Sequence, residues 1–185
     1  IHKVQQLCEG EKIEHFMQFI SVDTWGKQAE YIRPGLDFAR LQDNVERFLT
    51  DIPGRNSVTF IITMNNLVVP GLKDLLDWIL DLRSRHSHTY QRVWFDTPLL
   101  RAPQWQSLRT LPKAYHWKLG TVRDWMADNI MPPDSFVGFK DYEIQRMQRD
   151  LDWMAGAAGD QSGVKADFYR FFSEHDRRHG LKFID

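Results

Sequence analysis

The sequence predicts an α/β fold in which parallel strands alternate with helices and a group of C-terminal helices follows. Up to about residue 110, short runs of β-branched and aromatic residues alternate with stretches whose apolar residues recur every three or four positions. Beyond that point only the helical spacing continues. Alternating strands and helices favour a parallel sheet with right-handed crossovers. We therefore expect a strand-helix part over residues 1–110 and a helical part over residues 111–185 that packs on it.

The first predicted strand runs from Phe16 to Val22, after a stretch from His2 to His15 that reads as the end of a helix and a loop. Polar Ser21 and Asp23 lie at its C-terminal end. Residues of these types either point into a pocket or cap the next helix and close a turn. The pattern alone leaves both interpretations open.

A turn at Trp25-Gly26 and a polar linker are expected to lead to Arg33. An amphipathic helix is then predicted over residues 38–52, with Asp37 as its N-cap and Pro53-Gly54 as its end.

The second strand is predicted from Ser57 to Met64, a nearly unbroken run of the kind found where both faces of a parallel sheet are covered. Two amides, Asn65 and Asn66, follow it. Helical spacing from Leu72 to Leu82 predicts the next helix, and Arg92 to Asp96 reads as a third strand.

Three further helices are predicted in the C-terminal part, over residues 114–129, 142–155 and 164–179. A small-residue loop from Gly156 to Gly163 precedes the last of them, and Gly180 is expected to end it. The aromatic face of that helix favours core packing over ligand binding.

Composition restricts the function classes. The chain has 185 residues, 42% of them hydrophobic and 13% aromatic, which argues against disorder. Its 24 basic and 25 acidic residues give a net charge of -1, so nothing favours a nucleic acid or an anionic membrane as partner. Its apolar runs are far shorter than the roughly 20 residues that cross a bilayer. We expect a cytoplasmic protein that binds a small molecule or another protein.

A single cysteine, Cys8, excludes an internal disulfide and a multi-thiolate metal site built from this chain alone. Because Ile1 is not an ordinary translation start and residues 181–185 still carry strand-like apolar side chains, we expect a fragment.

Other site patterns are weaker. His86 and His88 could hold a metal only if further ligands converged on them, so a solvated loop is favoured. Asp23 and Asp96 end different strands and could face each other as the acid and base of a glycosidase do. Neither a serine elbow nor a glycine-rich phosphate loop is present.

Several segments resemble a known family, the radical S-adenosylmethionine (SAM) enzymes, closest to members with SPASM or twitch auxiliary domains. The segments similar to the fourth and fifth strand-helix units of those enzymes are Ile20 to Thr24, Glu30 to Arg33 and Ile62 to Asn65, the last opening onto Leu72 and Trp78. Later segments similar to the C-terminal part of twitch-type proteins are Phe139 to Ile144, Asp167 to Phe172 and Asp176 to Arg178.

The resemblance implies the C-terminal half of a partial (β/α)6 TIM-like barrel. Carried over from the family, Ser21 would contact the ribose of SAM and Arg33 its carboxylate, which suits a hydroxyl and a guanidinium fork. Asn65 is placed for a further polar contact, and Asp23 is expected to contact the cofactor or orient its neighbours. Residues 93–95 and Leu99 would line the adenine.

One departure from the family limits what the chain can do alone. The family binds a 4Fe-4S cluster through three cysteines of a CxxxCxxC loop, whereas this sequence has only Cys8. The resemblance therefore implies that cysteines outside this chain, in a missing N-terminal half, hold the cluster, and that the isolated chain is inactive. Its substrate would be an unknown peptide or small molecule.

The alternative is a non-catalytic interaction domain derived from half a barrel. It would bind a protein partner through aromatic helices that carry Trp78, Trp125 and Trp153, although core packing explains those positions equally.

Overall fold

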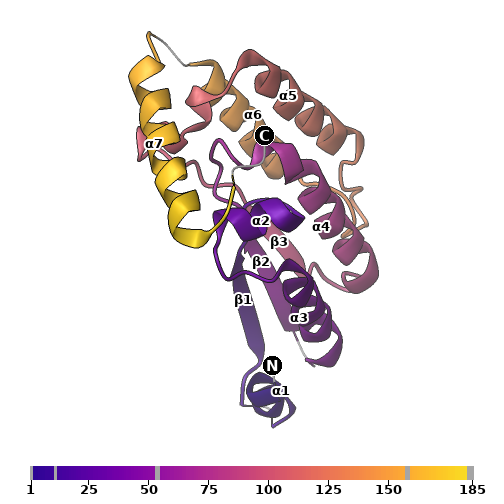
Figure 1. Ribbon diagram of the computed structural model, residues 1–185. Coiled ribbons are helices and arrows are strands. Elements are labelled where there is room, and N and C mark those ends of the chain that lie inside the picture. Colours follow the sequence, from indigo (N-terminus) through magenta and orange to yellow (C-terminus); the bar gives the residue numbers. More distant parts are fainter. Residues whose placement is uncertain (1, 11, 53–54, 157–158, 183–185) are drawn as a thin grey trace.

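The computed structural model describes residues 2–10, 12–52, 55–156 and 159–182 and has an α/β architecture (Figure 1). In chain order its helices and strands are α1 (His2–Glu9), β1 (His15–Ser21), α2 (Gly26–Ile32), α3 (Phe38–Asp51), β2 (Arg55–Ile61), α4 (Leu72–His86), β3 (Val93–Asp96), α5 (Lys113–Asp128), α6 (Asp141–Ala155) and α7 (Ser162–His179). Short 3-10 helices lie at η1 (Val69–Gly71), η2 (Gln104–Gln106) and η3 (Leu108–Thr110).

The three strands form one parallel sheet in the order β1-β2-β3. In its register Ser21 pairs with Ile61, and Ile61 pairs with Asp96, so the last residues of the strands lie in one row. Each pair of neighbouring strands is joined through helices, as parallel pairing requires. This confirms the predicted α/β class with parallel strands.

Helices α3 and α4 cover one face of the sheet. Val58 and Phe60 of β2 are fully buried there, and the Phe60 ring lies 5.2 Å from the ring of Trp78 on α4. Phe16 of β1 packs on Phe48 of α3 with ring centroids 5.9 Å apart. These contacts join the apolar stripe of each helix to alternate positions of the strands.

The opposite face is exposed at β1. Side chains alternate along a strand, and whereas Ile20 packs against the core, Phe19 is 59% exposed and Met17 41% exposed. In Figure 1 β1 forms the margin of the sheet, and it pairs only with β2 among the described residues. The sheet therefore has a free edge strand with an uncovered apolar face.

The C-terminal helices share the core of the strand-helix part. Leu119 and Met126 of α5 and Met147 of α6 are fully buried and belong to the same hydrophobic cluster as Phe60. Helix α7 is attached differently, by a small cluster in which Phe172 contacts Tyr31 of α2.

Most predicted elements are confirmed, and two predictions are wrong. His86, expected in a solvated loop, is the last residue of α4 and its side chain is only 13% exposed. The stretch expected to be a polar linker is helix α2, whose Ala29 and Tyr31 are buried. It was missed because a helix of seven residues is too short to show more than one helical repeat, Ala29 to Ile32, and tertiary burial stabilises it instead. The predicted caps are confirmed: Asp37 Oδ1 accepts the backbone N–H of Arg40 at 2.9 Å, and Gly180 is left-handed with φ 63°.

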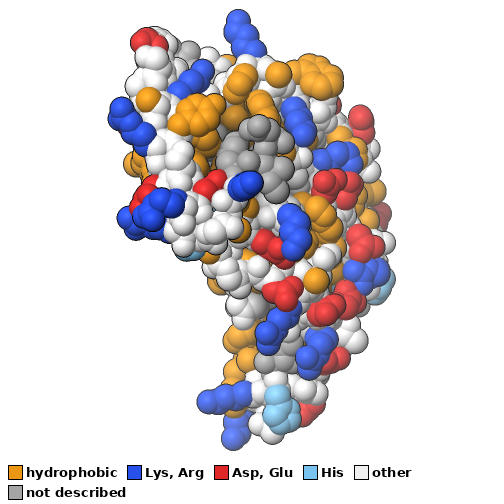
Figure 2. All heavy atoms as spheres, viewed as in Figure 1, with side chains coloured by type: hydrophobic (Ala, Val, Ile, Leu, Met, Phe, Trp, Pro, Cys, Tyr) orange, Lys and Arg blue, Asp and Glu red, His pale blue; other side chains and the backbone are white. Residues whose placement is uncertain are grey.

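Some predictions fall outside the described residues, namely the Pro53-Gly54 helix end, part of the Gly156 to Gly163 loop, and the last three residues. Among the described helices, none has the length and apolar character that a bilayer-spanning helix needs. Figure 2 shows side chains of both charges over α3 and α4, whereas apolar side chains gather between α7 and the start of α5.

Candidate functional site

The carboxyl ends of the three strands form the candidate site. Ser21, Ile61 and Asp96 end β1, β2 and β3 in one row, and the segments that follow carry polar side chains. In open parallel sheets, ligands bind outside the carboxyl ends of the strands. The side chains of Ser21 and Asp96 lie on the same face because residues in parallel register point the same way.

An ion pair between Asp23 and Arg33 dominates the end of β1. Asp23 is 3% exposed, and its Oδ1 accepts the backbone N–H of Thr63 at 2.9 Å. Its Oδ2 accepts a hydrogen bond from Nε of Arg33 at 3.0 Å and lies 3.0 Å from Nη2 of the same guanidinium. One carboxylate therefore ties the end of α2 to the segments after β1 and β2.

Arg33 keeps contact with solvent although it is paired. Its side chain is 37% exposed, whereas that of Asp23 is only 4% exposed. A guanidinium has five N–H donors, and Asp23 engages only two of its nitrogens. Arg33 can therefore bind an anionic ligand group while it holds Asp23.

Ser21 is exposed at the last position of β1. Its neighbour Ile20 packs into the core, so the alternation of the strand directs the hydroxyl to the uncovered face. The structure thus brings Ser21, Asp23 and Arg33 to the same end of the sheet.

Asn65 closes a turn after β2. Its Nδ2 donates to the carbonyl oxygen of Thr63 at 3.0 Å, and its Oδ1 accepts the backbone N–H of Leu67 at 2.8 Å. The side chain is 6% exposed. Because the oxygen and the nitrogen of the amide both form hydrogen bonds with the backbone, the geometry favours a structural role for Asn65.

The predicted adenine-lining segment lies along β3 and just beyond it. Leu99 forms a bridge with Met64, so the segments after β2 and β3 stay paired past the strand ends. Val93 and Phe95 are buried on the face that the helices cover. Of residues 93–95, only Trp94 faces the other side of the sheet. The Lys140 ammonium lies 4.1 Å from its ring centroid.

Sequence reasoning missed a second charged cluster at the end of β3. Asp96 Oδ1 accepts the backbone N–H of Thr97 at 2.8 Å and forms an ion pair with Arg146 of α6. One turn later, Arg149 donates to the carbonyl oxygen of Thr97 at 2.5 Å. The spacing of the two arginines puts them on one side of a helix, but nothing in the sequence indicates which strand they meet.

Asp150 of α6 lies behind this cluster with a fully buried side chain, and its Oδ1 accepts from Arg149 Nη2 at 2.8 Å. Burial raises the pKa of Asp150 to about 6, although the hydrogen bond from Arg149 opposes the shift. The group therefore changes charge near pH 6.

The two carboxylates considered as an acid and base pair have separate partners. Asp23 is bound by Arg33, whereas Asp96 is bound by Arg146. Strand β2 separates them, which puts the strand backbones roughly 10 Å apart.

No metal centre forms among the described residues, where no group of three potential ligands converges. His86 Nε2 lies 2.9 Å from Glu46 Oε1. Cys8 is near Asn56 Oδ1, 3.9 Å from its sulfur, at the amino-terminal end of β2. The only thiol of the chain is thus at the opposite end of the sheet from the candidate site and cannot hold a cluster there.

Comparisons with known proteins identify no relative. No family model, no curated protein and no solved structure matches this chain.

Proposed function

We propose that this chain is the C-terminal half of a radical SAM enzyme and that Ser21 and Arg33 contact the cofactor. The observation that carries the proposal is the position of Arg33. Its partly exposed guanidinium is held by Asp23 at the carboxyl end of β1, two residues beyond the exposed hydroxyl of Ser21.

The donor set suits SAM in part. The carboxylate of the cofactor would accept charge-assisted hydrogen bonds from Arg33, and Ser21 would exchange hydrogen bonds with a ribose hydroxyl. Asp23 acts as a positioning residue, because it orients the guanidinium and its own oxygens are already engaged. Leu99, which forms a bridge with Met64 and is partly buried against the core, would line the adenine.

The cluster does not fit this chain, since Cys8 lies at the other end of the sheet. When bound, a 4Fe-4S cluster supplies the electron that cleaves the carbon–sulfur bond of SAM. The proposal therefore requires cysteines from an upstream half, and the catalytic residues of the reaction remain outside this chain.

The exposed edge of the sheet supports the existence of such a half. All-parallel sheets are almost always covered on both faces, whereas Phe19 and Met17 of β1 are exposed. Further strands paired to β1 would cover these side chains and extend the sheet toward a partial (β/α)6 barrel.

Binding of SAM to the intact protein tests the proposal. Replacing Ser21→Ala together with Arg33→Lys should weaken binding at least tenfold in calorimetric titration, because lysine keeps the charge but loses the fork. The matched control is Arg47→Lys on α3, whose side chain is 64% exposed and pairs with Asp51. Unchanged affinity in the double variant, with the melting temperature preserved, would refute the assignment.

An interaction domain is the second candidate, and one observation favours it. Trp117 of α5 is 73% exposed and Tyr169 of α7 is 66% exposed. Of the tryptophans expected to serve this function, Trp78 packs on Phe60 and Trp125 packs on Phe139. Trp153 likewise stacks against Arg109, whose guanidinium carbon is 3.7 Å from the ring centroid.

A further inference from the structure

A cavity of about 650 Å³ lies between α2, the start of α5 and α7, next to the candidate site. Lys27, Gln28 and Tyr31 of α2 form one side, and Arg33 caps the same helix. Its size is within the range of sites that bind small organic molecules. Asn66 and Leu67, which follow β2 in the chain, also line it, so the cavity lies beyond the carboxyl end of that strand, where ligand sites of α/β proteins lie.

Aromatic rings form much of its wall. Tyr31 and Tyr115 come from α2 and α5, and Phe168 and Tyr169 come from α7. Tyr169 lines the cavity and is 66% exposed, so its ring is accessible to a bound molecule and is not part of the core. Such rings provide flat apolar surfaces on which a planar ligand stacks.

The charged side chains among the described residues of the cavity wall are all positive. Lys27, Lys118 and Lys165 line the cavity, and none of its described lining residues is acidic. Lys27 is paired with Glu30 at 2.7 Å, whereas Lys118 and Lys165 form no ion pair within the part of the chain that the structure describes. These two ammonium groups are exposed and attract an anion.

One acid outside the wall is close to Lys165. The pKa of Asp160 is lowered, first by hydrogen bonds from Ser162 and then by the charge of Lys165. The Asp160 carboxylate is already held by Ser162, at 2.7 Å from its hydroxyl and 2.9 Å from its backbone N–H. Lys165 therefore remains available to a ligand.

The cavity wall also contains a buried hydrogen-bond acceptor. Asn66 is a residue of the wall, and its Nδ2 donates to the carbonyl oxygen of Trp105 and to Thr110 Oγ1, each at 2.8 Å. These bonds fix the orientation of the amide, and its Oδ1 is buried without a partner among the described residues. A ligand N–H or O–H that reaches this oxygen would satisfy it.

From these features we infer that the cavity binds a small organic acid: a planar aromatic body held among the rings of α2, α5 and α7, with a carboxylate, sulfonate or phosphate at Lys118 and Lys165. The cavity binds this ligand class whether or not Ser21 and Arg33 bind SAM, so the two proposals fail separately.

Two fluorescent probes test this. 8-Anilinonaphthalene-1-sulfonate carries the anionic group, and N-phenyl-1-naphthylamine has the same ring system without it. We expect the sulfonate to bind to one saturable site. The double variant Lys118→Gln, Lys165→Gln should weaken its binding about tenfold while leaving the neutral probe unchanged. Tyr169→Ala should weaken both probes, because it removes a stacking surface.

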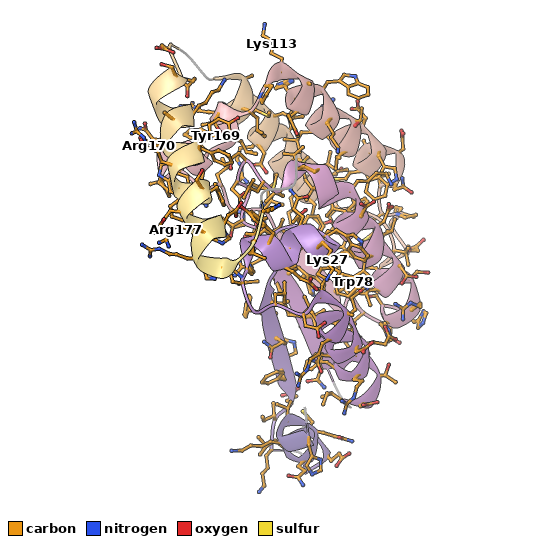
Figure 3. All side chains as sticks on the ribbon, viewed as in Figure 1. Lys27, Trp78, Lys113, Tyr169, Arg170 and Arg177 are labelled. Atoms are coloured by element: carbon orange, nitrogen blue, oxygen red, sulfur yellow. The ribbon has the colours of Figure 1, made fainter. Side chains whose placement is uncertain are left out.

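The matched control is Lys113→Gln with Arg170→Gln, which removes the same charge from the same two helices. Figure 3 shows Lys113 projecting outward from the start of α5 and Arg170 on the side of α7 away from α5, and neither lines the cavity. Equal loss of sulfonate binding in the control and test variants would overturn the inference. So would a test variant that binds the sulfonate as tightly as the parent protein does.

Discussion

Arg83 and Glu143 form a fully buried, bidentate ion pair that joins α4 to α6. Arg83 Nη2 lies 2.7 Å from Glu143 Oε1 and Nη1 lies 3.0 Å from Oε2, with the side chains 0% and 1% exposed. Arg83 also donates to the carbonyl oxygens of Val93 and Gly138, and Glu143 accepts the backbone N–H of Lys140. Every polar atom of the pair is thus occupied, as a buried pair requires.

Loss of the carboxylate should destabilise the protein strongly. Glu143→Gln leaves the Arg83 charge buried without its partner, which costs about 3 to 5 kcal/mol of unfolding free energy. Urea denaturation followed by circular dichroism measures this. Replacing both partners with apolar residues, Arg83→Met with Glu143→Leu, should recover much of the loss.

The exposed Glu174→Gln is the control, since Glu174 pairs with Arg177 and Arg178 at the solvated end of α7. It should hardly change the unfolding midpoint. A Glu143→Gln protein as stable as the Glu174→Gln protein would contradict the role assigned to the buried pair.

Stability should fall as pH rises from about 4 to about 6 because of Asp150. The folded state raises the pKa of this carboxyl from 3.8 to about 6, so the folded protein binds the proton more tightly than the unfolded chain does. Above pH 6 its ionisation costs up to about 3 kcal/mol, given about 1.4 kcal/mol per pH unit. Asp150→Asn should flatten this dependence in urea titrations from pH 4 to pH 7.

Asp152→Asn, on the same helix but exposed, controls for the change in net charge. Identical pH slopes in the parent protein and in Asp150→Asn would show that burial does not shift the pKa of Asp150 as described.

Two glycines should respond oppositely to alanine. Gly138 has φ 118°, and a Cβ there would lie 2.6 Å from Met131 Cα and 2.7 Å from its backbone nitrogen. Gly138→Ala should therefore lower the free energy of unfolding by at least about 1 to 3 kcal/mol. A Cβ at Gly120 within α5 meets nothing within 4 Å, so Gly120→Ala should stabilise by about 0.5 to 1 kcal/mol. Thermal melts of the two variants compare them directly. A lower melting temperature in Gly120→Ala would contradict the Gly120 prediction, and an unchanged or higher one in Gly138→Ala would contradict the Gly138 prediction.

The isolated chain should self-associate through the uncovered face of β1. Phe19 is 59% exposed beside an edge of β1 that pairs with no other strand among the described residues, and unpaired edges pair with other chains. Phe19→Lys should lower the mass measured by light scattering at a given concentration. Trp117→Lys, which changes an even more exposed ring on α5, should not. A monodisperse parent chain that Phe19→Lys leaves unaltered would exclude this surface as the contact.

The sequence predicted the strands and most helices because their signals are local. The β-branched run of β2 and the apolar spacing of α4 can each be recognised without knowledge of their neighbours. Helix α2 lacked such a signal, since burial of Ala29 and Tyr31 by distant segments stabilises it. Its structure depends on contacts that a short window of sequence does not contain.

The candidate site was predictable at β1 but not at β3. Ser21 and Asp23 follow a recognisable strand, and parallel pairing places strand ends together. Arg146 reaches Asp96 from 50 positions away, and Arg83 reaches Glu143 across 60 positions. Charged residues on helices usually face solvent, so nothing local separated these arginines and this glutamate from their exposed neighbours.

The buried Arg83–Glu143 pair also supports the charged cluster at the β3 end of the site. Glu143 lies one helical turn before Arg146, so whatever loosens the pair displaces the arginine that meets Asp96. If only one partner stays in the interior, its charge is buried without a counter-charge. Partly unfolded states are therefore disfavoured. This part of the molecule should therefore fold and unfold in a single cooperative step. At no temperature should the fold persist after the ion pair at the end of β3 has separated.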